Sequence, residues 1–238
     1  MDPESLTEWI GLLFAHPDLA RMGHAQRVAD RNLGLGWLYY ALARTIRPAA
    51  AVVIGSYRGF VPLVLGRALA DNSEGGEVAF IDPSFVDDFW KDAAAVRRYF
   101  AGLRVTNITH HLQTTQEFVR SPAYDELGSV GLVFVDGFHS AEQARFDFEA
   151  FADRLAPGGM ILLHDSVWRM ATGLYGSDRH YVHGVVDFVA ELKRQPQWQV
   201  FDVPCGDGVT IVRQSAVPPP PSRRRSAAAT LLAAGAAP

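Results

Sequence analysis

A chain of 238 residues that is 48% hydrophobic and 20% charged has the composition of a globular protein with one sizeable core, which excludes a disordered or fibrous chain. The formal net charge of −4 gives no sign of a nucleic-acid or anionic-membrane partner. The charge balance therefore favours a small-molecule ligand. The single cysteine, Cys205, excludes an intrachain disulfide framework and any cysteine-rich metal site. Because the N-terminus is acidic and no apolar run approaches the ~20 residues that cross a bilayer, we expect a cytoplasmic protein.

Apolar residues recur at helical spacing in two stretches of the first 47 residues, one around Trp9 and one from Leu33 onward. Both stretches precede the first strand-like run, so we predict an N-terminal helical cap at 1–48 in front of a principal domain at 49–215. The apolar character of these helices is compatible with a homodimer. The segment 216–238 consists of a proline run, three arginines and small residues, which predicts a disordered tail.

From residue 50 onward, strand-like and helical runs alternate. The predicted strands are short, apolar and rich in β-branched residues, and they cover 50–55, 77–82, 105–112, 130–136 and 159–165. The predicted helices cover 60–70, 87–103, 115–122, 140–156 and 183–195. The runs 198–204 and 208–214, joined by CGDG, predict a closing β-hairpin. This alternation predicts an α/β fold with a mostly parallel, two-sided sheet and an antiparallel edge.

Ligands of open parallel sheets bind at the carboxyl ends of the strands, so the residues at those ends are the candidates for a site. The first predicted strand leads into GSYRGF, in which Gly55 and Gly59 would let the backbone approach a ligand at a helix N-terminus. Any tight strand-to-helix turn also favours glycine. The turn contains neither the GxGxxG of dinucleotide sites nor the GxxxxGK of a P-loop, and the chain has no YxxxK pair, which disfavours a nicotinamide-dependent reductase.

Polar residues also end the next strands. Asp82 could accept hydrogen bonds from both hydroxyls of a ribose, or it could merely start the turn before Pro83. The polar run 113–115 suits a base edge, although loop polarity explains it nearly as well. The fourth and fifth predicted strands end on Asp136 and Asp165, and two carboxylates at adjacent strand tips repel unless a cation lies between them. A metal ion or a cationic substrate is therefore implied.

Two stretches resemble a known family. GSYRGF resembles the first motif, GxYxGY, of class I S-adenosylmethionine-dependent O-methyltransferases of the caffeoyl-coenzyme A and catechol type. FVDGFHSAEQARFDFEAFADRLAPGGMILLHDS is similar to the matching region of small-molecule O-methyltransferases that act on antibiotics, sugars and related natural products. The resemblance covers 50–213 and implies a Rossmann-like class I methyltransferase with a mostly parallel seven-stranded sheet, N-terminal accessory helices and a C-terminal antiparallel hairpin.

The resemblance also implies a cofactor site for S-adenosylmethionine. It places Gly55, Tyr57 and Gly59 along the methionine part of the cofactor, Asp82 on its ribose, Thr115 near its adenine and Asp136 beside it. One position departs from the family, because Val53 stands where Glu or Asp usually precedes the first glycine by two residues. Loss of that acid bears on cofactor affinity and not on the fold.

In metal-dependent relatives, the Asp that ends strand four and two adjacent groups after strand five hold magnesium or calcium. The resemblance therefore implies a divalent cation on Asp136, Asp165 and His164, with His164 standing where one pattern has Glu and Ser166 where the other has Asn. Magnesium prefers oxygen ligands, whereas an imidazole favours a softer transition metal. The alternative is that His164 packs or hydrogen-bonds beneath the site while Asp165 caps the loop.

His139 is the predicted catalytic residue. It stands three residues after Asp136, where catechol-type enzymes carry a lysine base and some sugar-modifying relatives a histidine. An imidazole with a pKa of ~6.5 can accept a hydroxyl proton near neutral pH. A lone loop histidine is more often inert, so this prediction depends on the neighbouring aspartates. His180 and His183 form an HxxH pair that could line the acceptor pocket or bind a metal, and we favour an ordinary loop role for them.

These features predict an O-methyltransferase that acts on a hydroxyl of a small molecule, such as a natural product, sugar or phenol, with help from a divalent metal and from His139. One alternative is a metal-independent N- or O-methyltransferase in which the two aspartates bind a cationic or polyhydroxyl acceptor. Another is a non-catalytic cofactor-binding or oligomerisation module, which Val53 and the altered third metal ligand leave open.

Overall fold

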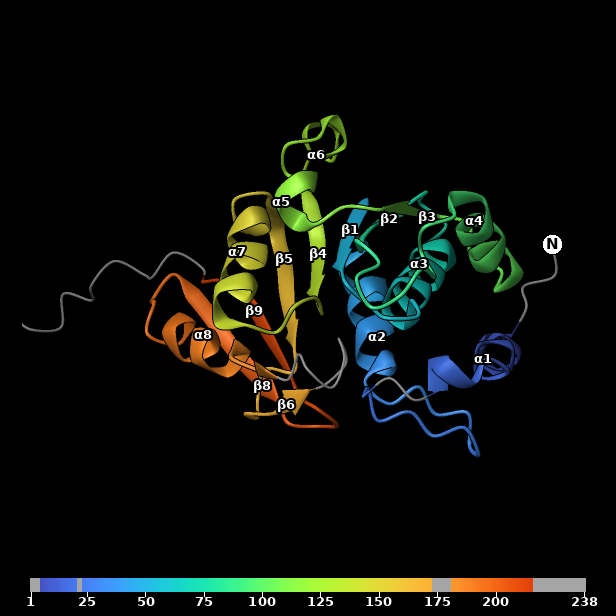
Figure 1. Ribbon diagram of the computed structural model, residues 1–238, viewed down its shortest axis with the longest axis horizontal. Helices are drawn as coiled ribbons and strands as arrows, with labels where there is room; N and C mark the ends of the chain where they lie inside the picture. The colour runs from blue at the N-terminus through green and yellow to red at the C-terminus, as the bar shows by residue number, and fades with distance from the viewer. Residues whose placement is uncertain (1–4, 21–22, 173–180, 216–238) are drawn as a thin grey trace, which may run out of the picture.

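A seven-stranded sheet forms the centre of the computed structural model, which describes residues 5–20, 23–172 and 181–215 (Figure 1). The strand order is β3-β2-β1-β4-β5-β9-β8. Its strands are β1 (Ala50–Ile54), β2 (Glu77–Ile81), β3 (Ile108–His111), β4 (Val130–Val135), β5 (Leu155–His164), β8 (Trp198–Val203) and β9 (Val209–Gln214). Strands β1 to β5 pair in parallel, and β9 runs antiparallel between β5 and β8. The predicted α/β fold, with a mostly parallel seven-stranded sheet and an antiparallel C-terminal hairpin, is confirmed.

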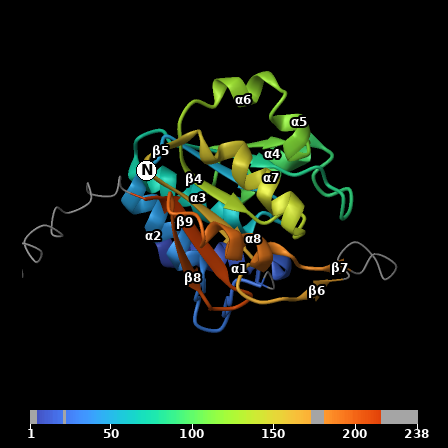
Figure 2. The ribbon, with the colours of Figure 1, turned by 90° about the vertical axis from the view of Figure 1, so that its left-hand side faces the viewer.

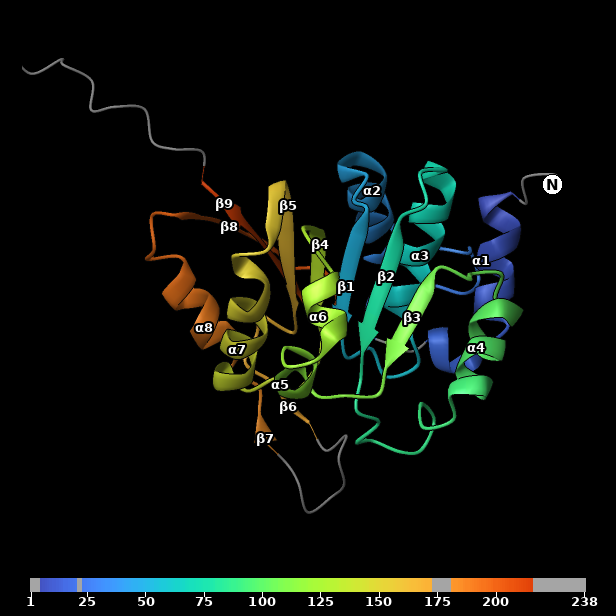
Figure 3. The ribbon, with the colours of Figure 1, turned by 90° about the horizontal axis from the view of Figure 1, so that it is seen from above.

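Helices cover both faces of this sheet (Figure 3). They are α1 (Leu6–Phe14), η1 (Pro17–Ala20), α2 (Gly36–Ile46), α3 (Phe60–Asn72), α4 (Ala93–Gly102), α5 (Thr115–Phe118), α6 (Pro122–Glu126), α7 (Ala141–Ala152) and α8 (Val185–Leu192). Successive side chains of a strand point to opposite faces, so β1 sends Val53 into the core under α1 to α4 and Val52 into the core under α5, α7 and α8. Burial on both faces explains why the strands read as continuous apolar runs.

The N-terminal helices belong to the same core as the sheet. Trp9 of α1 is fully buried, and its indole Nε1 donates a hydrogen bond of 3.0 Å to the carbonyl oxygen of Leu103, just after α4. Tyr39 of α2 is also fully buried and packs edge-on against Phe134 of β4, with ring centroids 4.7 Å apart. Helices α1 and α2 therefore share one core with the strands that carry the site.

The structure departs from the prediction at the starts of α4 and β5 and in one additional small sheet. Helix α4 starts at Ala93 rather than near residue 87, because the Asp92 side chain accepts hydrogen bonds from the backbone N–H groups of Ala94 and Ala95 and caps the helix there. Strand β5 starts at Leu155, ahead of the glycines that were expected to begin it, and a register shift against β4 accommodates the extra residues. A small sheet of β6 (Ala171–Thr172) and β7 (Tyr181–Val182) was not predicted; it lies near α8 (Figure 2).

The strand order reverses between β1 and β4, because the chain moves outward from β1 to β3 and then returns to the other side of β1. In open α/β sheets, the crevice at the carboxyl ends of the strands beside such a reversal is where ligands bind. A ligand site is therefore expected at the tips of β1, β2, β4 and β5. Within the described residues, no helix is both long enough and apolar enough to span a membrane.

Candidate functional site

A cavity of about 1150 Å³ opens at the carboxyl ends of β1, β2, β4 and β5. It gathers eight of the nine predicted site residues from five separate stretches of chain: Gly55, Tyr57, Asp82, Thr115, Asp136, His139, His164 and Asp165. The ninth, Gly59, is not on its lining. Gly59 is the N-cap of α3 with φ of +84°, and a Cβ there would lie 3.0 Å from the ring of Trp90, so its observed role is to start the helix.

Gly55 allows the first and fourth strands to approach each other at the cavity floor. Its φ is +67°, and a Cβ at this position would lie 2.4 Å from the carbonyl oxygen of Asp136 and 2.7 Å from the α-carbon of Gly137. Its own N–H donates a hydrogen bond of 2.8 Å to the carbonyl oxygen of Ile81. No other residue type fits this backbone without moving a strand tip.

We expect Gly55→Ala to lower the free energy of unfolding by several kcal/mol more than Gly75→Ala. Gly75 is the matched control, because its φ is +73° but nothing lies within 4 Å of a Cβ built on it. The control variant loses about 1 kcal/mol from the left-handed backbone alone. Urea unfolding monitored by circular dichroism measures both variants, and equal losses would mean that the strand tips yield easily to a methyl group.

The cavity wall next to Gly55 is built by Tyr57, which the resemblance predicted, together with Arg58 and Trp90, which sequence reasoning missed. Tyr57 has a φ of +41°, which is strained for a non-glycine residue. Its carbonyl oxygen accepts a hydrogen bond of 2.9 Å from the indole Nε1 of Trp90. The guanidinium of Arg58 lies 4.1 Å from the centroid of the Tyr57 ring and pairs with Asp87 at 2.6 Å. These contacts hold the strained backbone in place at the cavity wall.

Asp82 lies at the tip of β2 with its carboxyl group directed to the cavity side. Its Oδ1 accepts a hydrogen bond of 2.7 Å from the backbone N–H of Ser84. Burial raises the pKa of Asp82 to about 6, even though the N–H groups of Ser84 and Ser56 favour the ionised form; the charge of Asp136 adds to the rise. Asp82 therefore loses its ionised, hydrogen-bond-accepting form as the pH falls below about 6.

A chain of polar side chains lies at the other end of the cavity. Thr115 is 3% exposed at the start of α5 and hydrogen-bonds the buried carboxyl of Asp147. Asp147 accepts a hydrogen bond of 2.7 Å from the side-chain amide of Gln143. The side-chain oxygen of Gln143 in turn accepts one of 2.8 Å from the side-chain amide of Gln116. Burial raises the pKa of Asp147 to about 6. Sequence reasoning missed Asp147, although an acid three residues after Ala144 on the apolar face of α7 was a signal for it.

His164 occupies the space between the two strand-end aspartates. Its Nδ1 lies 3.0 Å from Oδ1 of Asp136 and 2.9 Å from Oδ1 of Asp165. The ring is 3% exposed and packs against His24 below, with centroids 4.4 Å apart. Burial alone would lower the pKa of His164, but the two carboxylates outweigh burial and raise that pKa to about 10. The cation that the two aspartates require is therefore supplied by a side chain of the protein.

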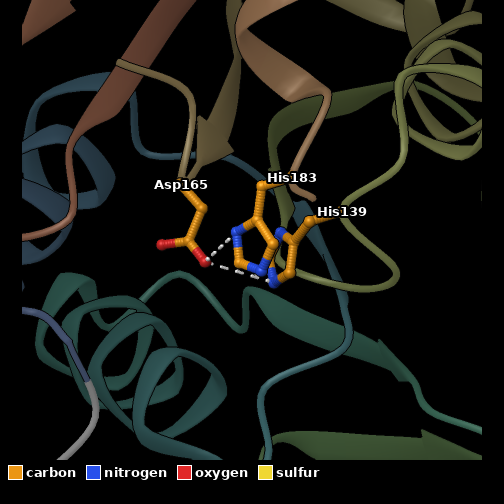
Figure 4. A group of neighbouring side chains, drawn as sticks. All are labelled: His139, Asp165 and His183. Carbon is orange, nitrogen blue, oxygen red and sulfur yellow. Dashed lines mark ion pairs between the residues drawn. The ribbon is translucent and has the colours of Figure 1, made fainter. Parts of the chain in front are cut away.

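Two further histidines surround the other oxygen of Asp165 (Figure 4). The Nε2 of His139 lies 3.4 Å from Oδ2 of Asp165 and 3.8 Å from Oδ1 of Asp136, and the Nδ1 of His183 lies 3.2 Å from Oδ2 of Asp165. Their rings stack with centroids 4.5 Å apart. Burial lowers the pKa of His139, against the pull of both carboxylates. His183 was predicted to have an ordinary loop role and instead joins this cluster; His180 lies outside the described residues.

Ser166, the other residue considered for a metal, turns away from the cluster. It is 1% exposed, and its hydroxyl donates to the carbonyl oxygen of Leu163 or to the Thr210 hydroxyl, each at 2.8 Å. Across the described part of the chain, the group of metal-capable ligand atoms within 4.8 Å of one another consists of His139, Asp165 and His183. That group shares only Asp165 with the predicted set of Asp136, Asp165 and His164.

Comparison with known proteins agrees with this architecture. Residues 52–166, which run from β1 to just past β5, match a methyltransferase-domain family. This match identifies residues 52–166 as a methyltransferase domain. This methyltransferase superposes on the O-methyltransferase TomG from Streptomyces achromogenes, solved in complex with S-adenosylmethionine, with a TM-score of 0.62 and 18% identity over 90% of this chain and 91% of that one. The predicted class I methyltransferase enzyme is confirmed by its domain family and its fold.

Two further proteins are similar to this chain. The methyltransferase PaMTH1 from Podospora anserina, solved with S-adenosylhomocysteine, gives a TM-score of 0.60 with 21% identity over 90% of this chain and 89% of that one. An uncharacterized protein of Sinorhizobium fredii, y4gI, is 29% identical over 142 residues, which cover 55% of this chain. The present chain spans only 14% of the length of the Sinorhizobium fredii protein.

Proposed function

We propose that this methyltransferase transfers the methyl group of S-adenosylmethionine to a hydroxyl oxygen of a small molecule. The observation that carries the proposal is that one cavity joins the Asp82 carboxyl to the cluster of Asp136, His139 and Asp165. A ribose-binding acid at one end and an imidazole beside carboxylates at the other are the groups that a cofactor and a hydroxyl acceptor need. The cofactor complexes of TomG and PaMTH1, with the same fold, support the same use of the cavity.

The cofactor would lie along the strand tips. Asp82, at the end of β2, would accept hydrogen bonds from the two ribose hydroxyls, and Thr115 would lie at the adenine end beside Asp147. Gly55 and Tyr57 would face the methionine part, where the absence of a Cβ at Gly55 leaves room against Asp136. This arrangement directs the sulfonium group toward His139.

His139 would act as the general base. The acceptor oxygen attacks the methyl carbon in line, the carbon–sulfur bond breaks with its electrons moving to sulfur, and the hydroxyl proton moves to Nε2 of His139. Asp165, 3.4 Å from that nitrogen, stabilises the imidazolium that forms. Because burial lowers the pKa of His139, the ring is neutral and able to accept a proton near pH 7. Alignment of the two reactants in one cavity supplies the rest of the rate.

The residues present do not fit the magnesium ion that the family resemblance implies. Magnesium needs oxygen ligands around an octahedron, but the His164 imidazole fills the space between Asp136 and Asp165 at 2.9 and 3.0 Å. The third ligand position is occupied by Ser166, whose hydroxyl is engaged with Leu163 and Thr210. Metal-independent transfer to oxygen is therefore the form of the reaction that these contacts favour.

Transfer of a radiolabelled methyl group from S-adenosylmethionine to paired hydroxyl and amine acceptors tests this function. The panel contains sugars, phenols and aliphatic alcohols, each beside its amine counterpart, and every reaction runs with excess chelator and again with added magnesium. We expect label on at least one hydroxyl compound at the same rate in both conditions. Label found only on amines, or S-adenosylhomocysteine binding without any transfer, would reject the proposal.

We expect the affinity for S-adenosylhomocysteine to fall as the pH drops below about 6. The ribose hydroxyls donate to the ionised carboxylate of Asp82, and burial raises the pKa of that group to about 6, so protonation at lower pH removes the acceptor. The dissociation constant should rise up to about tenfold per pH unit between pH 6 and pH 4.5. Calorimetric titrations measure it, and Asp82→Asn is the control, which should bind weakly at every pH. A parallel pH dependence in both proteins would place the titrating group elsewhere.

A further inference from the structure

We propose that His139, Asp165 and His183 form a binding site for one transition-metal ion of the zinc, cobalt or nickel type, distinct from the divalent-cation set of Asp136, Asp165 and His164 that the resemblance implied. The three side chains come from the β4–α7 loop, the tip of β5 and the segment before α8, and they converge at one edge of the cavity (Figure 4). The site shares Asp165 with the predicted set and replaces Asp136 and His164 by two imidazoles.

The spacing of the ligand atoms suits such an ion. Oδ2 of Asp165 lies 3.4 Å from Nε2 of His139 and 3.2 Å from Nδ1 of His183, and all three atoms lie within 4.8 Å of one another. Tetrahedral zinc with bonds of about 2.0 to 2.1 Å separates its ligand atoms by about 3.3 Å. A small movement of side chains therefore brings the three atoms onto one ion.

The chemistry of the donors selects the class of metal. Two imidazoles and one carboxylate form a nitrogen-rich set, which suits zinc, nickel, cobalt or copper and does not suit magnesium or calcium. His164 lies 2.9 Å from Oδ1 of Asp165 and leaves Oδ2 turned toward the other two histidines. A hydrogen-bonding group that fixes the second oxygen of a ligating carboxylate is the usual support behind a metal ligand.

Backbone contacts hold the two histidines together. The N–H of Gly184 donates a hydrogen bond of 2.8 Å to the carbonyl oxygen of His139, and the N–H of His183 donates one of 2.7 Å to that of Met170. A Cβ at Gly184 would lie 2.9 Å from the N–H of Ala141, so the starts of α7 and α8 are in direct contact. The site is therefore built by the fold and does not depend on a chance meeting of surface side chains.

The position of the site links it to the proposed function, on which this consequence rests. His139 and Asp165 line the cavity, so an ion held by them has an open side toward the acceptor. A coordinated Nε2 has no lone pair left to take a proton, so His139 cannot serve as a ligand and as a base at once. Bound metal should therefore stop turnover, and its removal should restore turnover.

Metal binding is tested on the full chain, without a histidine tag and after treatment with chelator. Equilibrium dialysis with Zn²⁺ and the visible absorption of Co²⁺ report stoichiometry and ligand field. We expect one ion per chain in the wild type and at least tenfold weaker binding in His183→Ala, His183→Gln and Asp165→Asn. His16→Ala and Cys205→Ser, which remove an exposed imidazole and the exposed thiol, are the controls and should bind as the wild type does.

Binding that is unsaturable, or equal in the wild type and both His183 variants, would overturn the site. Turnover gives the second readout: methyl transfer by the wild type should fall in step with Zn²⁺ occupancy and recover with chelator. Stoichiometric binding with undiminished turnover would leave the metal site standing and reject His139 as the base. A chain that transfers no methyl group to any acceptor would reject the proposed function, while the dialysis result would still decide the metal site.

Discussion

Replacing His139 with alanine is expected to lower kcat by about 10² to 10⁴ while the dissociation constant for S-adenosylhomocysteine changes less than twofold. The imidazole lies near Asp165 at the acceptor side of the cavity, away from the Asp82 carboxyl that would hold the ribose. Removing it takes away proton transfer and leaves the cofactor contacts in place. Initial rates at saturating cofactor and calorimetry with the product measure the two effects separately.

Two comparisons make this result specific to the base. His16→Ala removes an exposed histidine far along the chain from the cluster and should keep wild-type turnover. His139→Gly leaves space where the ring stood, so added imidazole should restore part of the rate. A His139→Ala variant with wild-type turnover would end the assignment, and an equal loss in cofactor affinity would show that His139 shapes the cavity instead.

Replacing His164 with alanine is expected to lower the free energy of unfolding by about 3 to 5 kcal/mol. The substitution removes a buried cation and leaves Asp136 and Asp165 facing each other near the base of the cavity. A second substitution, Asp136→Asn, removes one of the opposed charges and should recover part of the loss. Urea unfolding of the wild type, both single variants and the double variant gives the coupling energy.

The same variants test whether His164 prevents Mg²⁺ from binding between Asp136 and Asp165. With the His164 ring gone, the two carboxylates have room for a divalent ion, so millimolar Mg²⁺ should raise the melting temperature of His164→Ala and leave that of the wild type unchanged. A loss below about 1 kcal/mol in His164→Ala would show that the two aspartates are not held by this imidazole. A wild type stabilised by Mg²⁺ would show that the ion displaces the ring and that the predicted metal set forms.

The fold was predictable because its signals are local. Short β-branched runs alternating with helical patterns define the parallel strands, and the acids Asp82, Asp136 and Asp165 follow from the rule that sites form at strand ends. The sequence also predicted that Asp136 and Asp165 end adjacent strands, and the pairing of β4 with β5 confirms this. The start of β5 was less predictable, since a bulge lets Leu155 pair with Val130 ahead of the glycines.

The observed position of His164 beneath the site is the alternative that the sequence left open beside metal binding. Side chains two apart on a strand share a face, so His164 points with Leu162 into the core under α1 to α4, where it meets His24. This explains why it lies beneath the two carboxylates and not beside them. His24 itself lies 140 positions earlier in the chain, and no local pattern pairs the two rings.

The approach of His183 to His139 depends on long-range backbone contacts. A hydrogen bond from Gly184 to the carbonyl oxygen of His139 joins segments more than forty positions apart, and the spacing of an HxxH pair holds no information about it. The acid Asp147 is a different case, since it breaks the apolar face of α7 at a buried position. A buried acid on such a face needs a partner, and here the partners are Thr115 and Gln143.

A crystal structure of the chain with S-adenosylhomocysteine and a hydroxyl-bearing acceptor tests the central claim most directly. We predict that the cofactor fills the cavity of about 1150 Å³, with both ribose hydroxyls on the Asp82 carboxylate and its sulfur directed toward the acceptor. The acceptor hydroxyl should lie within hydrogen-bonding distance of Nε2 of His139. A cofactor with its ribose away from Asp82, or an acceptor hydroxyl out of reach of His139, would contradict the account.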